Sequence, residues 1–350
     1  MKKKVIRYAL VFAFIGVTLF LLQRLLMPKY VDDVVEGSLI SEYYNETTNH
    51  DVLFVGDCEV YENFSPIKLW QDYGVTSYIR GSAQQLIWQS YYLLEDALRY
   101  EKPKVVVFNV LSMKYDEPQK EAYNRMSLDG MRWSKSKIDA INASMCEEES
   151  FMSYVFPLLR YHSRWSEMNA NDVKYMFSSK QISHNGYYMR VDTKAAENVP
   201  TGKALSNYQF GDNSYKYLDK MVKLCKDNDI QLVLIKAPSL YPYWYEQWDE
   251  QMESYAKRNN VQYINFLDCT EEAGIDFNKD TYDGGLHMNL DGAEKLTDYF
   301  GKWLTDKYEL TDHRNEDEYK SVYEEKIKFY EDMKADQYKE IEEYGKVVSY

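Results

Sequence analysis

Short apolar segments that alternate with amphipathic helical patterns restrict the possible folds of this chain most strongly. Five such segments are rich in β-branched residues and have the length of strands, and the stretches between them have the spacing of helices with one apolar face. This alternation is typical of a parallel sheet covered by helices on both faces. We therefore expect an α/β three-layer sandwich with a parallel five-stranded sheet. The expected strands are 52–55, 75–79, 104–108, 231–235 and 262–266, and the expected helices are 66–73, 83–100, 215–228, 247–259 and 290–307.

Two regions do not follow this alternation. A stretch of about 111–208, after the third expected strand, has weak periodicity and many aromatic residues. An insertion at this edge of an α/β sheet commonly shapes a binding site, although it can equally be a packing subdomain. The α/β domain is expected over 31–312. After it, apolar residues recur at helical intervals among charged ones, which predicts an amphipathic helical tail over 313–350 that packs on its own domain or on a partner.

The N-terminus has the features of a membrane anchor. Three lysines and Arg7 precede an uncharged run from Tyr8 to Gln23, and apolar residues continue to Met27. Such a segment is long enough to cross a hydrocarbon core of about 30 Å. The basic start predicts that the N-terminus stays in the cytoplasm and that the rest is exported. No small residues mark a cleavage site near Met27, so we expect an uncleaved anchor over 1–30 rather than a signal peptide.

Composition bounds the possible partners. The formal net charge is −14 and no basic stripe lies beyond the N-terminus, which argues against nucleic-acid binding. The 34 tyrosines suit polar or sugar-like partners, since the ring packs while the hydroxyl bonds, but a general compositional bias of the source explains them equally well. The sequence indicates no cofactor and no metal site.

One cysteine stands at a place where chemistry is expected. The first expected strand ends directly on Gly56, Asp57 and Cys58, a turn that would present a single side chain at the carboxyl edge of the sheet. The other cysteines, Cys146, Cys225 and Cys269, are far apart, and a domain of this size does not need disulfides for stability. Cys58 is therefore a candidate nucleophile, with a disulfide or a small buried side chain as the alternatives.

A carboxylate and an imidazole lie close together near the other end of the chain. Asp283 and His287 flank Gly284 and Gly285, which permit a tight turn. An imidazole oriented by a carboxylate can take a proton from a nucleophile and return it to a leaving group. Alone this spacing is weak evidence. Together with Cys58 at the end of a strand, it predicts a catalytic triad. In this triad the neighbouring histidine is expected to lower the pKa of the Cys58 thiol, so that the thiolate forms readily.

These motifs resemble those of the SGNH/GDSL hydrolases. Gly56-Asp57-Cys58 corresponds to the nucleophile motif of that family, with Cys in place of Ser, and Asp283 with His287 corresponds to the late acid–base motif, with one extra residue between them. Gly81 and Asn109, which follow the second and third expected strands, correspond to the residues that complete the oxyanion hole. The resemblance covers about 51–306 and implies an SGNH-like fold and acyl-ester chemistry.

The anchored, exported arrangement is similar to one group within this family, which includes the teichoic acid D-alanyl transfer protein. That resemblance implies acyl transfer onto or off a cell-envelope glycopolymer through a Cys58 thioester, together with a membrane-bound O-acyltransferase. Two alternatives stay open: a catalytically inactive SGNH-fold binding or scaffold component, and a simple esterase. Further candidates for polar substrate contacts are Arg80, Lys236, His162 and Arg164, of which the last two could instead form a buried polar pair inside the insertion.

Overall fold

A parallel five-stranded sheet forms the centre of the protein in the computed structural model, which describes residues 2–27, 36–176 and 181–348. The strand order is β2-β1-β3-β4-β5, and every neighbouring pair is parallel, as predicted. The strands are β1 (Val52–Gly56), β2 (Ser77–Gly81), β3 (Val105–Asn109), β4 (Gln231–Lys236) and β5 (Gln262–Asn265).

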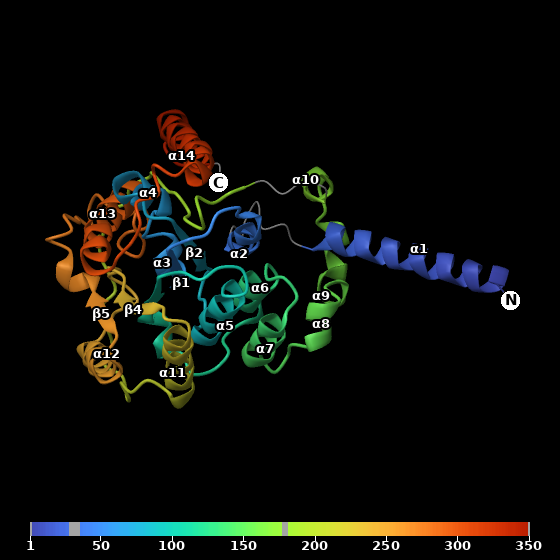
Figure 1. The fold of residues 1–350 in the computed structure, drawn as a ribbon, viewed down its shortest axis with the longest axis horizontal. Coiled ribbons are helices and arrows are strands. Elements are labelled where there is room, and N and C mark those ends of the chain that lie inside the picture. Colours follow the sequence, from blue (N-terminus) through green and yellow to red (C-terminus); the bar gives the residue numbers. More distant parts are fainter. Residues whose placement is uncertain (1, 28–35, 177–180, 349–350) are drawn as a thin grey trace.

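Two layers of helices cover the sheet (Figure 1). Side chains of successive strand residues point to opposite faces, and in β1 Leu53 and Val55 join one core cluster whereas Val52 and Phe54 join the other. The first cluster is completed by α5 (Ile87–Ala97), α11 (Asp212–Asp227) and α12 (Glu246–Asn259). The second is completed by α4 (Pro66–Tyr73) and α13 (Leu290–Lys307). The three-layer α/β sandwich is therefore present as expected.

The insertion after β3 consists of short helices followed by an irregular stretch. It begins with η2 (Val110–Lys114) and continues with α6 (Glu121–Leu128), α7 (Lys135–Ser144), α8 (Phe151–Val155), α9 (Leu158–Tyr161), η3 (His162–Ser166) and α10 (Ala170–Tyr175). The stretch from 181 to 211 has no strand or helix, apart from an isolated bridge between His184 and Tyr187. Figure 1 shows α8, α9 and α10 at the side of the domain from which α1 projects.

The N-terminal helix α1 (Lys2–Leu26) stands away from the domain (Figure 1) and is long and apolar enough to cross a membrane. Its most apolar window has a mean hydropathy of 2.3, and none of that window is buried. The short elements α2 (Glu36–Glu42) and η1 (Tyr43–Asn45) lead into β1. The predicted boundary between anchor and domain, at residue 30, lies outside the described residues.

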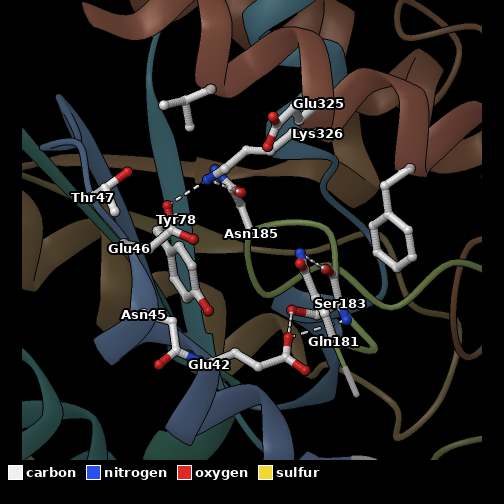
Figure 2. Close-up of a pocket in the computed structure, with 12 residues that line it drawn as sticks. Glu42, Asn45, Glu46, Thr47, Tyr78, Gln181, Ser183, Asn185, Glu325 and Lys326 are labelled. Atoms are coloured by element: carbon white, nitrogen blue, oxygen red, sulfur yellow. Dashed lines mark hydrogen bonds and ion pairs between the residues drawn. The ribbon is translucent and has the colours of Figure 1, made fainter. Parts of the chain in front are cut away.

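The C-terminal tail forms one long helix, α14 (Asp317–Tyr344), which packs on its own domain. Tyr323 and Tyr330 are buried, and Tyr323 stacks on Trp70 of α4. Figure 2 shows Lys326 of α14 between Glu46 and the Asn185 side chain, to which its Nζ donates at 2.6 Å. A cavity of about 650 Å³ lies there, and residues of α2, η1 and α14 line it, among them Glu42, together with Ser183.

Candidate active site

The turn after β1 places Cys58 at the carboxyl edge of the sheet. Gly56 has a φ of +155°, and a Cβ there would lie 2.5 Å from Val60 Cγ2, so only glycine fits. Asp57 caps the short helix α3 (Cys58–Tyr61), since its Oδ1 accepts a hydrogen bond from the Glu59 N–H at 3.2 Å. Asp57 thus orders the turn, and Cys58 is the first residue of the helix.

His287 and Asp283 lie in a turn just before α13. His287 Nδ1 is 2.7 Å from Asp283 Oδ2, and the His287 N–H donates to Asp283 Oδ1 at 2.9 Å. Gly284 and Gly285 have φ values of +90° and +104°, so the two glycines between carboxylate and ring adopt a conformation that other residues rarely take. The Met288 N–H donates to Asn63 Oδ1 at 2.8 Å, which ties this turn to the segment after α3.

The structure brings Cys58 and His287 together, although they are far apart in sequence. The ring lowers the pKa of the thiol and the thiol raises the pKa of the ring, so the two groups lie close together. Yet His287 Nε2, which is buried, forms no hydrogen bond of regular geometry. The thiol is therefore a close neighbour of the ring without a well-aligned bond to Nε2, an arrangement that is common in active sites without bound substrate.

A second carboxylate, missed in the sequence, shares the same imidazole nitrogen. Glu62 Oε2 is 3.3 Å from His287 Nδ1, and the Tyr282 hydroxyl donates to the same oxygen. The Tyr282 ring stacks on His287 with the ring planes 19° apart. Glu62 follows Cys58 by four residues, and its N–H donates to the Cys58 carbonyl at 3.1 Å, so helical spacing was the signal that could have found it.

The surroundings of Cys58 and His287 shift the pKa of the thiol in the direction opposite to the one predicted from the sequence. Burial raises the pKa of the Cys58 thiol to about 11, although the residue is partly exposed; His287 lowers that pKa, and Asp57 and Glu62 raise it further. Burial lowers the pKa of His287, but Glu62, Cys58 and Asp283 outweigh it and hold the pKa well above its usual value. The predicted depressed thiol pKa is thus wrong, because burial, Asp57 and Glu62 favour the protonated thiol.

The two residues expected to complete an oxyanion hole lie at the same edge of the sheet. Gly81 pairs in register with Gly56, and a Cβ on Gly81 would lie 3.1 Å from the Gly56 carbonyl oxygen. Asn109 is fully buried, and its Nδ2 donates to Asp57 Oδ1 at 2.9 Å and to Glu59 Oε2 at 3.0 Å. Both amide hydrogens are therefore engaged by carboxylates, so in this geometry the Asn109 side chain has none to offer an oxyanion.

Two of the expected polar substrate contacts are structural instead. The Lys236 ammonium is fully buried and pairs with Glu59 Oε2 at 2.9 Å, the oxygen that also accepts from the Asn109 amide. The Arg80 guanidinium is also fully buried; it donates to the Leu93 carbonyl at 2.7 Å and lies over the Tyr43 ring at 4.2 Å. Both charges are compensated within the core, so neither side chain is available to a substrate.

The other two expected contacts lie in the insertion beside α1. His162 is exposed and its Nδ1 is 3.2 Å from the Leu159 carbonyl oxygen. Arg164 donates to the Leu26 carbonyl at 2.7 Å and to Asp172 at 3.1 Å. Neither belongs to the Cys58 site, and they do not form the buried pair considered as the alternative. Among the described residues, no group of three or more His, Cys, Asp or Glu side chains is placed so that it could hold a metal ion.

Comparisons with known proteins give a likeness of arrangement only. A scan against protein-family models and a search of the curated proteins gave no match. Among solved structures, a protein assigned to the G-D-S-L family of lipolytic proteins from Desulfitobacterium hafniense is 16% identical, with 73% of this chain and 100% of that chain covered at a TM-score of 0.37. A GDSL-like lipase from Bacteroides thetaiotaomicron is 14% identical, with 73% and 88% covered at a TM-score of 0.32. Scores this low establish no shared activity, so the chemistry of the site is argued from its own geometry.

Proposed function

We propose that the protein carries out acyl-ester chemistry with Cys58 as nucleophile. The observation that supports this most is the grouping of Cys58, His287 and Asp283 at one edge of the sheet, with Asp283 on Nδ1 and a buried Nε2 left without a regular partner. A carboxylate on Nδ1 fixes the tautomer in which Nε2 of the neutral ring can accept a proton. That nitrogen can then accept the proton of the neighbouring Cys58 thiol.

The proposed reaction begins after the imidazolium has lost one proton. His287 Nε2 then takes the proton of the Cys58 thiol, and the thiolate sulfur forms a bond to the carbonyl carbon of an acyl ester. The backbone N–H groups of Cys58 and Gly81 are the proposed donors to the oxyanion. The ester C–O bond breaks, and the leaving oxygen takes the proton from His287. An acceptor hydroxyl, deprotonated by the same nitrogen, attacks the thioester and releases the thiol.

We further propose that the acceptor is a hydroxyl of a cell-envelope glycopolymer. The helix α1 would hold the domain at the membrane, outside the cytoplasm, where a membrane-bound O-acyltransferase could supply the acyl group. The resemblance to anchored SGNH proteins supports this proposal. Release of the acyl group to water, as in a simple esterase, uses the same first step and differs only in the acceptor.

A catalytically inactive binding component is the second candidate. Two observations favour it: the pKa of the Cys58 thiol is raised to about 11, and both amide hydrogens of Asn109 are engaged by carboxylates. In that case the fold would bind an acyl ester or a polymer without reacting with it.

The two candidates differ in covalent chemistry at Cys58. The purified full chain in detergent is incubated with an activated acetyl ester, and adducts are located by peptide mass spectrometry across pH 7 to 9.5. An enzyme should acquire an acyl group on Cys58 that Cys58→Ala abolishes, that His287→Ala slows, and that Cys269→Ala leaves unchanged. Absence of the adduct at every pH, with normal folding, would favour the binding component. Chase with water or with a polysaccharide then separates hydrolysis from transfer.

A further inference from the structure

The insertion displays a run of large apolar side chains to solvent. Trp165 is 71% exposed, Leu159 59% and Phe156 51%. Met152, Met168 and Val173 of the same stretch are also exposed. Elsewhere in the described domain, exposed apolar side chains of this size are scattered along the sequence, for example Ile138 and Tyr243. A concentration of this kind marks an interaction surface. We call residues 152–173 the apolar platform.

The apolar platform is attached to the end of α1. The Arg164 guanidinium donates to the Leu26 carbonyl at 2.7 Å, and the Arg24 Nε donates to the Met176 carbonyl at 3.0 Å. The helices α9 and α10 and the turn η3 contact α1, and Leu26 is the one buried residue of α1. Figure 1 shows this attachment at the domain end of α1. The platform therefore covers the last turn of α1 and leaves the rest exposed.

The length of α1 places that last turn at a membrane surface. Its 25 residues extend about 37 Å at 1.5 Å per residue. The part of α1 that crosses a hydrocarbon core of about 30 Å therefore ends near Arg24 and Leu26. An element fixed to the Leu26 carbonyl must then lie at the boundary between hydrocarbon and head groups.

The composition of the apolar platform suits that boundary. Tryptophan is enriched at membrane interfaces, where its ring is buried and its N–H reaches water. Leu159 and Phe156 provide apolar contacts of the kind that interfacial segments bury. We propose that the apolar platform inserts into the head-group region of the outer leaflet of the same bilayer that holds α1. This rests on α1 spanning the membrane and is independent of any reaction at Cys58.

The test uses the emission of Trp165 in the full chain. The protein is reconstituted in nanodiscs of phosphatidylcholine, with and without lipids brominated at a shallow or a deep acyl position. The difference between the parent and Trp165→Phe isolates Trp165 among the seven tryptophans. Trp303→Phe is the matched control, because Trp303 lies on α13, at the opposite side of the domain from α1 (Figure 1).

Shallow bromine should remove roughly half of the Trp165 emission, since interfacial side chains lie about 5–10 Å into the head-group and acyl boundary. Deep bromine should remove less, and neither should affect Trp303. Equal emission of Trp165 in plain and brominated nanodiscs would overturn the proposal. Circular dichroism of both variants, expected to match the parent, confirms that the comparison is between folded proteins.

Discussion

Replacing Glu62 by Gln should make Cys58 more reactive at neutral pH. The carboxylate of Glu62 lies 3.3 Å from His287 Nδ1 and raises the pKa of both members of the thiol–imidazole pair. Glutamine removes the charge but keeps a carbonyl that can accept from Tyr282. The first proton of the coupled pair should then leave at a lower pH, so that the thiolate–imidazolium form appears sooner.

The magnitude follows from the pKa of the thiol. With a pKa of about 11, a fraction of roughly 10⁻⁴ of Cys58 is thiolate at pH 7, about 100-fold less than for a thiol at the ordinary 9.0. A more basic thiolate is also more nucleophilic, which returns about tenfold of this loss. Lowering the thiol pKa by one should therefore speed alkylation at pH 7 about threefold. Removing a like charge at this range lowers a pKa by roughly one to two, so a 3- to 10-fold acceleration is expected.

The assay is iodoacetamide labelling of Cys58 at pH 6 to 10, followed peptide by peptide. The labelling rate of the parent should rise steadily with pH across this range. At each pH the rate should be lower in His287→Ala than in the parent, because the imidazolium lowers the thiol pKa. The matched control is Glu101→Gln: Glu101 is also buried, accepts from Tyr43 at 2.6 Å and lies 3.0 Å from His50 Nδ1. A parent rate at pH 7 equal to that of a free thiol, or equal rates in Glu62→Gln and Glu101→Gln, would refute the reasoning.

Two predictions concern stability, measured by thermal or urea unfolding of the full chain in detergent. Lys236→Met leaves the Glu59 carboxylate buried without its cation and should cost about 3–5 kcal/mol, whereas Lys223→Met, which breaks an exposed pair with Asp227, should cost under about 1 kcal/mol; similar losses in both would contradict the structural role of Lys236. Burial lowers the pKa of His184 to about 3, against 6.5 in the unfolded chain. Between pH 7 and 5 the unfolded chain therefore binds a proton that the folded chain does not, and the parent should lose about 2 kcal/mol of its free energy of unfolding. His184→Asn should remove that part of the pH dependence, and an unchanged slope would show that His184 does not remain neutral.

The sheet could be predicted because buried strands carry their own signal. Four of the five expected strands agree with the structure to within one residue at each end. The second was placed at 75–79 but runs from Ser77 to Gly81. Gly74 ends α4 with a φ of +68°, so Val75 still belongs to the connection. The strand continues through Arg80, whose charge the sequence pattern treats as a boundary, because its guanidinium is compensated inside the core.

The sequence could not predict which side chains from distant elements contact each other. Cys58 and His287 were found because each stands in a local motif with recognisable spacing. The roles of Arg80 and Lys236 depend on Leu93 and Glu59, which only the packing of separate elements brings into contact with them. A basic residue after a strand is equally consistent with binding a substrate and with neutralising a buried carboxylate, and the sequence alone does not distinguish these cases.

The protonation of the site depends on the same long-range packing. A motif identifies a thiol, an imidazole and one carboxylate, and from these three groups a reactive ion pair is the natural expectation. The fold adds Glu62, a further negative charge that favours the protonated form of both the thiol and the ring, and Asp57 also favours the protonated thiol. Nucleophilic attack needs one proton fewer than this resting state holds. Because Glu62 lies beside the imidazole and favours its protonated form, we expect Glu62 to influence strongly how readily that proton leaves His287.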